Sequence, residues 1–205
     1  MSYRKEACVI NLSQALNAEK AGAHRVEICS RLETEGMTPD TELVEEIIRK
    51  LNIPVRVMIR CTESGYHADK SEMQQMIDSI REFKRIHVDG FVVGIMKHDL
   101  IDKDVMLQVI NHAAPVHITF HKAIDASHNL YRDLLWLNEH PSVDTVLTSG
   151  GATVARDAVD KIVMMKSFFK RNIMAGGKIT ANNLLALHEK LNLDWYHGRS
   201  IVGEL

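Results

Sequence analysis

The sequence predicts an α/β protein in which eight parallel strands close into a (β/α)8 TIM barrel, and three observations lead to this prediction. Short runs rich in β-branched residues alternate with longer amphipathic segments along the whole chain. The short runs begin roughly 19 to 35 residues apart, which leaves room for a helical crossover and requires parallel pairing. No Gly-x-Gly-x-x-Gly turn follows the first run, so an open dinucleotide-binding sheet is less favoured.

The strands and helices are expected in strict alternation. The predicted strands begin near eight positions: Glu6, Arg25, Val55, Gly90, His117, Thr145, Ile173 and Asp194. Apolar residues recur with helical spacing in the seven intervening segments: 13–21, 40–51, 71–87, 103–112, 130–138, 155–170 and 181–190. Pro39 and Asp40 are typical of a helix start, and Pro54 follows the end of the same helix. The chain ends soon after the last strand, so the barrel is expected to lack a full final helix.

The composition favours one domain, residues 1–205, located in the cytoplasm. Of the 205 residues, 45% are apolar, and no linker-like or low-complexity segment interrupts them. Lys and Arg number 25 against 27 for Asp and Glu, without a basic run, so nucleic acid and membrane surfaces are disfavoured as partners. No apolar stretch approaches the ~20 residues that span a bilayer, and the polar N-terminus does not resemble a signal peptide. Three cysteines without a CxxC pair indicate free thiols in a reducing compartment.

Alternation along the strands predicts which side chains point into the barrel. The expected inward set draws on six strands: Glu6, Cys8, Glu27, Cys29, Arg56, Met58, Arg60, His117, Thr119, His121, Val146, Thr148, Trp195 and His197. Ionised groups inside a barrel are costly unless they are paired, so we expect Glu6, Glu27 and Arg60 to neutralise one another in a functional centre. A polar plug that only stabilises a small barrel is the alternative.

Six residues form a candidate catalytic set near the C-terminal rim, where barrel enzymes place their chemistry: Glu6, Glu27, Arg60, His121, Asp125 and His197. His121 can exchange a proton near neutral pH, with Asp125 or Glu27 orienting it. Arg60 can hold a carboxylate or phosphate through two parallel hydrogen bonds. These residues alone predict an enzyme, either a lyase, an isomerase or a hydrolase, that acts on a small anionic or phosphorylated metabolite.

Backbone amides in glycine-containing loops form a candidate anion site. The residues are Ser149, Gly150, Gly151, Gly176, Gly177, Gly198 and Arg199, and Lys178 can supplement them. Glycine pairs at strand-to-helix turns are also common simply as turn residues, and this conformational role is the somewhat favoured alternative.

Several short motifs resemble the CutC family, and they occur in order over essentially the whole chain. They are RVEICS at 25–30, GMTP at 36–39, PVRVMIR at 54–60, TFHKAID at 119–125, LTSGG at 147–151, MAGGKI at 174–179 and HG at 197–198. The resemblance implies a cytosolic (β/α)8 barrel that forms homo-oligomers, dimers or larger, and takes part in copper homeostasis. The chain departs from the family pattern after the third strand, where CTESGY at 61–66 replaces a segment with a second arginine and two glycines.

The resemblance makes copper the expected metal, and Cys8 and Cys29 are the candidate ligands. Alternation places both thiols inward on adjacent strands, where two thiolates satisfy a soft Cu(I) ion and Met58 can add a thioether. Two neighbouring cysteines are also common as small core residues. Copper handling and catalysis on a small anion are therefore the two main functions that the sequence predicts. A third, weaker alternative is a degenerate family member whose altered loop 61–66 has ended the ancestral activity, so that neither ligand binds.

Overall fold

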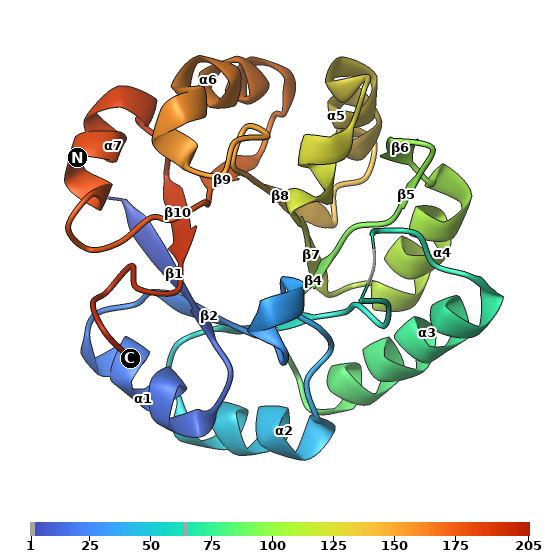
Figure 1. The fold of residues 1–205 in the computed structure, drawn as a ribbon. Helices are drawn as coiled ribbons and strands as arrows, with labels where there is room; N and C mark the ends of the chain where they lie inside the picture. Colours follow the sequence, from blue (N-terminus) through green and yellow to red (C-terminus); the bar gives the residue numbers. More distant parts are fainter. Residues whose placement is uncertain (1–2, 64) are drawn as a thin grey trace.

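The chain forms a closed barrel of eight parallel strands surrounded by helices, as Figure 1 shows in a view along the barrel. The computed structural model describes residues 3–63 and 65–205. In sequence order the barrel strands are β1 (Arg4–Val9), β2 (Arg25–Ile28), β3 (Val55–Met58), β4 (Gly90–Val93), β7 (His117–Phe120), β8 (Val143–Thr148), β9 (Asn172–Ala175) and β10 (Trp195–Gly198). Their order around the barrel follows the sequence, and β1 closes it against β10. The predicted (β/α)8 barrel is confirmed.

Helices follow the barrel strands in turn and cover their outer faces. They are α1 (Leu12–Lys20), α2 (Thr41–Lys50), α3 (Lys70–Arg85), α4 (Lys103–Ala113), α5 (Leu130–Asn138), α6 (Val159–Phe168) and α7 (Leu184–Leu191), with short 3-10 helices η1 (Leu32–Thr34), η2 (Lys122–Ala126) and η3 (Ala155–Ala158). The segment predicted as one helix over 155–170 divides into η3 and α6. After β10, residues 199–205 form turns and isolated bridges rather than a helix. No described helix is long and apolar enough to cross a membrane.

One short hairpin was not predicted. Strands β5 (Met96–Lys97) and β6 (Leu100–Ile101) pair in the antiparallel sense outside the barrel. Two residues per strand are too few to show an alternating pattern in the sequence. The hairpin lies between β4 and α4, and the N–H of Ile101 donates to the buried carboxylate of Asp133 on α5.

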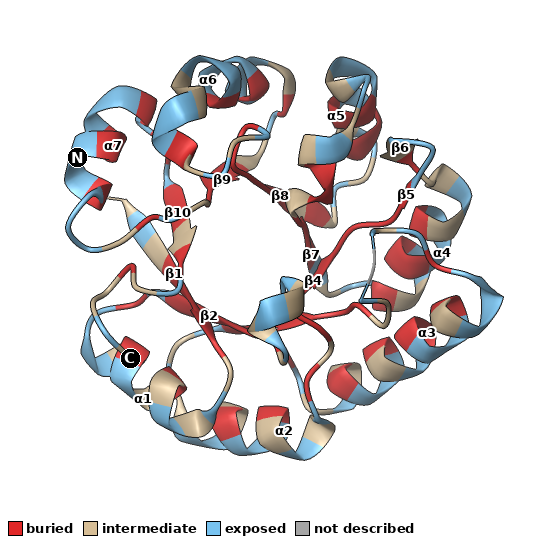
Figure 2. Cartoon of the chain, viewed as in Figure 1, coloured by how far each residue is buried: buried red, intermediate tan, exposed pale blue. Residues whose placement is uncertain are grey.

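The core has an outer layer between strands and helices and a smaller interior inside the barrel. Figure 2 shows buried residues along the strands and on the helix faces that cover them. Alternation predicted Val146 and Thr148 as inward on β8, and this prediction is wrong. Val146 packs in the outer layer, whereas Leu147 packs in the interior against Met174 and Trp195. Because Val146 and Leu147 are both apolar, the sequence does not show which of them points inward. The pairing of β7 with β8 also shifts register between Ile118 and Thr119, which interrupts the alternation between neighbouring strands.

A separate polar network occupies the N-terminal end of the barrel around Arg56. The buried guanidinium donates to both carboxylate oxygens of Asp144, at 2.8 and 2.6 Å, to Asp89 at 3.1 Å and to the Thr119 hydroxyl at 2.6 Å. A side chain at Gly90 would lie 2.8 Å from the Arg56 Nε, so this glycine makes room for the arginine. These bonds satisfy Arg56 within the fold, which leaves the opposite end of the barrel as the candidate site.

Candidate functional site

A cavity of about 250 Å³ opens at the C-terminal end of the barrel strands. Its lining joins soft, acidic and basic groups: Cys8, Cys29, Met58, Glu27, Glu35, Arg60, Lys122, Lys178, Arg199, His121, His197 and Tyr66, together with Leu32, Leu147, Gly177 and Gly198. Active sites of (β/α)8 barrels lie at this end because the strand-to-helix loops converge there. The cavity is therefore the candidate functional site.

Two thiols form the soft part of the cavity. The sulfur atoms of Cys8, on β1, and Cys29, directly after β2, lie 3.6 Å apart. Both side chains are buried, and they cluster with Met58 and Val92 inside the barrel. The hydrogen bond to Cys29, then burial and the charge of Glu27, raise the pKa of the Cys8 thiol well above its usual value. The metal-free site therefore holds Cys8 as a protonated thiol.

A buried charge network adjoins the thiols and centres on Glu6. The strands place Glu6 opposite His197 in register, and the His197 Nδ1 lies 2.9 Å from Glu6 Oε1. The Nε of Arg25 donates to the other carboxylate oxygen at 2.5 Å. Burial opposes ionisation of Glu6, but Arg25 and His197 outweigh it and lower the pKa to about 2. Glu6 is thus ionised at neutral pH.

Arg25 is a member of this network that the sequence analysis missed. It takes the role that Arg60 was expected to play, and its guanidinium also stacks over the Trp195 ring at 4.1 Å. The prediction that Arg60 neutralises Glu6 and Glu27 is wrong. The signal was present, because Arg25 lies two residues before Glu27 and alternation places both on the inward face.

Glu27 has one buried carboxylate oxygen without a hydrogen bond among the described residues. This oxygen, Oε2, lies 3.5 Å from the His197 Nδ1. Burial raises the pKa of Glu27 to about 7, since His197 only partly compensates and Glu6 adds repulsion. Burial disfavours the charged imidazole, yet Glu27 and Glu6 together raise the pKa of His197. Cys8, Glu27 and His197 each bring a ligand atom to one place, all within 4.8 Å of one another.

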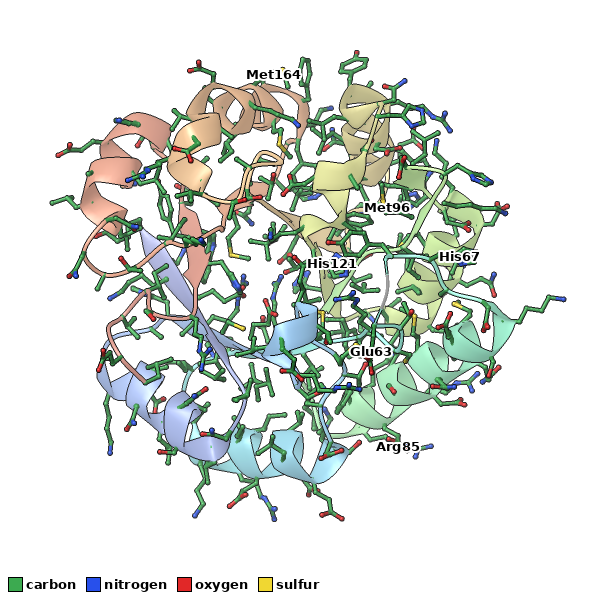
Figure 3. The ribbon with its side chains drawn as sticks, in the orientation of Figure 1. Glu63, His67, Arg85, Met96, His121 and Met164 are labelled. Carbon is green, nitrogen blue, oxygen red and sulfur yellow. The ribbon has the colours of Figure 1, made fainter. Side chains whose placement is uncertain are left out.

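His121 lies on another wall of the cavity, and its protonation differs from what the sequence predicted. Figure 3 shows it near the middle of the barrel, at the end of β7. Burial first, and then the charge of Arg60, lower the pKa of His121 to about 3. Its Nδ1 accepts from the N–H of Ala123 at 3.1 Å. The ring is therefore neutral, which contradicts the expectation of proton exchange near neutral pH.

Asp125 accepts hydrogen bonds from residues at the end of β8 and in the loop after it. Its carboxylate accepts from the Ser149 N–H at 2.8 Å, from the Ser149 hydroxyl at 2.9 Å and from the Thr148 hydroxyl. No hydrogen bond joins Asp125 to His121 in the described part of the chain. The expected orienting role of Asp125 toward His121 is therefore absent from this arrangement.

Arg60 joins two loops at the cavity rim. Its terminal nitrogens donate to the carbonyl oxygens of Thr34 at 2.7 Å, Gly36 at 3.4 Å, Glu63 at 3.4 Å and Gly65 at 3.2 Å. Within residues 3–63 and 65–205, no carboxylate lies within ion-pair distance of it. Arg60 thus holds the altered loop 61–66 through hydrogen bonds to its backbone. Ser64 in this loop lies outside the described residues.

The predicted anion site divides into two parts. Three of its backbone N–H groups already donate hydrogen bonds inside the protein: Ser149 to Asp125, Gly150 to the Thr148 hydroxyl and Gly176 to the Thr148 carbonyl oxygen. Gly151 lines a neighbouring cavity together with Ser149 and Gly177. Three other members, Gly177, Gly198 and Arg199, line the main cavity together with Lys178. Any anion in the main cavity would therefore meet the loops after β9 and β10.

The fold and the cavity define a (β/α)8 barrel whose C-terminal rim combines thiols with ionisable side chains. The chain belongs to the CutC family, whose family model matches residues 3–202, and the resemblance in its motifs is confirmed. It is 33% identical over 201 residues to the copper homeostasis protein cutC homolog of Mus musculus, across 95% of this chain and 72% of that protein. Identity to a family protein CutC of Enterococcus faecalis is 30% over 208 residues, across 97% of this chain and 99% of the relative.

A solved structure shares this fold. The crystal structure of a CutC protein from Streptococcus agalactiae matches the fold with a TM-score of 0.91, across 97% of this chain and 99% of that chain. The two sequences are 23% identical, so the likeness concerns the fold.

Proposed function

We propose that the protein binds cytoplasmic Cu(I) through the thiolates of Cys8 and Cys29. The 3.6 Å separation of the two sulfur atoms carries this proposal, because one ion can reach both ligands with small side-chain adjustments. Soft thiolate and thioether donors suit Cu(I), and the thioether of Met58 belongs to the same cluster. The mouse relative is named for copper homeostasis, which supports the same assignment.

Burial gives this site its chemical character. Both thiols are buried inside the barrel and line the cavity, so the ion would enter from the C-terminal end of the strands. Coordination requires thiolates, and each captured ion therefore displaces thiol protons. Copper is the cargo of this site, and Cys8 and Cys29 would hold it.

An anaerobic competition titration with a chromophoric Cu(I) chelator tests the proposal. Wild type is expected to withdraw one Cu(I) per chain from the chelator, and Cys8→Ser/Cys29→Ser is expected to lose this ability. Cys61→Ser is the matched control, because Cys61 is a free cysteine outside the thiol pair. Competition that survives removal of both thiols would overturn the proposal.

Catalysis on a small anionic metabolite is a second candidate function. The pairing of Glu27 with His197 favours it, since a carboxyl group with a pKa of about 7 can exchange a proton at neutral pH. Lys178 and Arg199 line the same cavity and can attract a carboxylate or phosphate. Thermal-shift measurements with phosphorylated and carboxylated metabolites would test it. A ligand is expected to stabilise wild type and to lose its effect in Lys178→Gln/Arg199→Gln, and an effect that persists in this variant would contradict the assignment.

A further inference from the structure

We propose that the cavity also contains a site for a divalent cation of the Zn²⁺ type, with Cys8, Glu27 and His197 as ligands. This site goes beyond the Cu(I) proposal and shares only Cys8 with it. Thiolate, carboxylate and imidazole are the three ligand types that Zn²⁺ prefers in proteins. Cys29 and Met58 have no part in it.

The distances between the donor atoms fit this assignment. Zn²⁺ binds such ligands at about 2.0–2.3 Å, so the donor atoms of a tetrahedral site lie roughly 3.3 to 3.8 Å apart. The three candidate ligand atoms lie within 4.8 Å of one another. The Glu27 Oε2 and the His197 Nδ1 are already 3.5 Å apart. Small side-chain rotations are therefore sufficient to close the site.

The buried Glu27 oxygen that has no hydrogen bond is the independent observation that points to a cation. Glu27 is 2% exposed, and its Oε2 has no hydrogen bond among the described residues. A buried polar atom without a partner is costly and rare in native proteins. A cation bound to Oε2 would satisfy this atom directly, whereas His197 now lies 3.5 Å away, beyond hydrogen-bond contact. The neighbouring thiol and imidazole complete the ligand set without a change in the backbone.

The backbone holds the ligands rigidly on adjacent strands. Cys8 on β1 is the register partner of Glu27 on β2, and Glu6 on β1 is the register partner of His197 on β10. In the metal-free protein the His197 Nδ1 lies 2.9 Å from Glu6 Oε1, and Arg25 in turn fixes Glu6. A cation at Nδ1 would replace the proton of this contact, so Glu6 holds the ring beside the proposed site only until the cation binds.

Three protein ligands leave one coordination position for an exchangeable group. Catalytic zinc sites keep such a position open, whereas structural ones fill all four with protein ligands. The cavity beside the site is lined by Lys178 and Arg199. The class of ligand that fits this position is therefore a small carboxylate or phosphate, whose charge both the metal and these two side chains would attract.

Zinc binding by the metal-free full chain tests the inference. Zn²⁺ is titrated in competition with a chromophoric chelator, and Co²⁺ is added in parallel because its spectrum reports thiolate ligation and tetrahedral geometry. Wild type is expected to bind one ion per chain with a thiolate-to-cobalt absorption band. Glu27→Gln and His197→Gln are each expected to weaken Zn²⁺ binding by at least about 30-fold.

Variants of single ligands separate this site from the Cu(I) site. Cys29→Ser is expected to keep its Zn²⁺ affinity within about 3-fold of wild type and to lose Cu(I) binding. Glu27→Gln is expected to keep Cu(I) binding and to lose Zn²⁺ affinity. Circular dichroism establishes that each variant is folded, and His197→Gln replaces Glu27→Gln if the latter does not fold. Zn²⁺ affinity unchanged in the folded variants, or a Co²⁺ spectrum without a thiolate band, would overturn the inference. If wild type bound Zn²⁺ as expected but did not bind Cu(I), only the copper proposal would be overturned.

Discussion

Cys8 and Glu27 are direct register partners on β1 and β2, so a thiol and a buried carboxylate share one wall of the cavity. Cys29 adds a second thiol 3.6 Å from Cys8, while His197 adds an imidazole 3.5 Å from Glu27. Cys8 therefore lies between a soft ligand on one side and harder ligands on the other. This position is the physical basis for both proposed metal sites.

Replacing Glu27 with Gln is expected to stabilise the metal-free protein in mildly alkaline solution. Burial raises the pKa of Glu27 to about 7 from 4.5, so between these values the folded protein keeps a proton that the unfolded chain releases. The associated stability is present below pH 4.5 and is lost as the pH rises toward 7. At about pH 8 we expect Glu27→Gln to melt a few degrees above wild type, equivalent to about 1–3 kcal/mol.

Differential scanning calorimetry in the presence of a chelator measures this effect. At about pH 4.5 the two proteins are expected to melt together, because Glu27 is then protonated in the folded state. A Glu27→Gln variant that melts below wild type at about pH 8 would show that the carboxylate has a stabilising partner.

Removal of the Glu6 carboxylate is expected to destabilise the protein, in contrast to removal of the Glu27 carboxylate. Despite burial, Arg25 and His197 lower the pKa of Glu6 to about 2 from 4.5, so its stabilisation is present above pH 4.5 and is lost as the pH falls toward 2. Glu6→Gln also leaves Arg25 buried without its ion-pair partner, which costs about 3–5 kcal/mol at neutral pH. Urea unfolding curves between about pH 3 and pH 7 measure both effects.

The matched control for this variant is Glu189→Gln, which changes an exposed carboxylate on α7. It is expected to unfold like wild type within about 0.5 kcal/mol at every pH. If Glu6→Gln lost stability toward acid as steeply as wild type, Glu6 would not be the source of the acid sensitivity.

His121 is expected to remain neutral through the physiological pH range. Burial and Arg60 lower the pKa of its ring to about 3, and Nδ1 accepts the N–H of Ala123, so the proton resides on Nε2. Nitrogen-15 NMR of the histidine side chains should therefore show one resonance pair with no titration between about pH 5 and pH 8. Exposed histidines, such as His117, provide the internal control. A midpoint within this range for His121 would restore it as a candidate proton-transfer residue.

Arg60→Lys is expected to loosen the cavity rim while it keeps the positive charge. Arg60 donates to carbonyl oxygens of two loops, at Thr34 and Gly36 on one side and Glu63 and Gly65 on the other. Lysine lacks the planar fork that makes these bonds together. Amide hydrogen exchange should rise about 10-fold or more in both loops and stay unchanged in α5. Unchanged exchange in the loops would show that other contacts hold them.

The barrel was predictable from the sequence, because each strand carries an inward and an outward face and each crossover has room for a helix. The inward positions of Glu6, Cys8 and Cys29 follow from this alternation. The phase of β8 was not predictable, since Val146 and Leu147 are both apolar and a register shift offsets the strand.

The hydrogen-bond partners of Arg60 and Asp125 were not predictable from the sequence. Arg60 follows the end of β3, where the chain leaves the barrel, and its long side chain reaches loop carbonyl oxygens rather than Glu6. Asp125 has hydrogen bonds to Ser149 because η2 lies against the loop after β8, a contact between segments distant in the sequence. Alternation assigns the face of a strand, but only the folded loops determine which of these groups meet.

X-ray absorption at the copper edge of the Cu(I)-loaded full chain tests the proposed function most directly. The inner shell is expected to contain sulfur scatterers at a distance typical of thiolates, and Cys29→Ser is expected to replace part of this sulfur with oxygen or nitrogen. Cys61→Ser should leave the spectrum unchanged. An inner shell of nitrogen or oxygen in wild type, or a sulfur shell that is identical in Cys29→Ser, would contradict Cu(I) binding by Cys8 and Cys29.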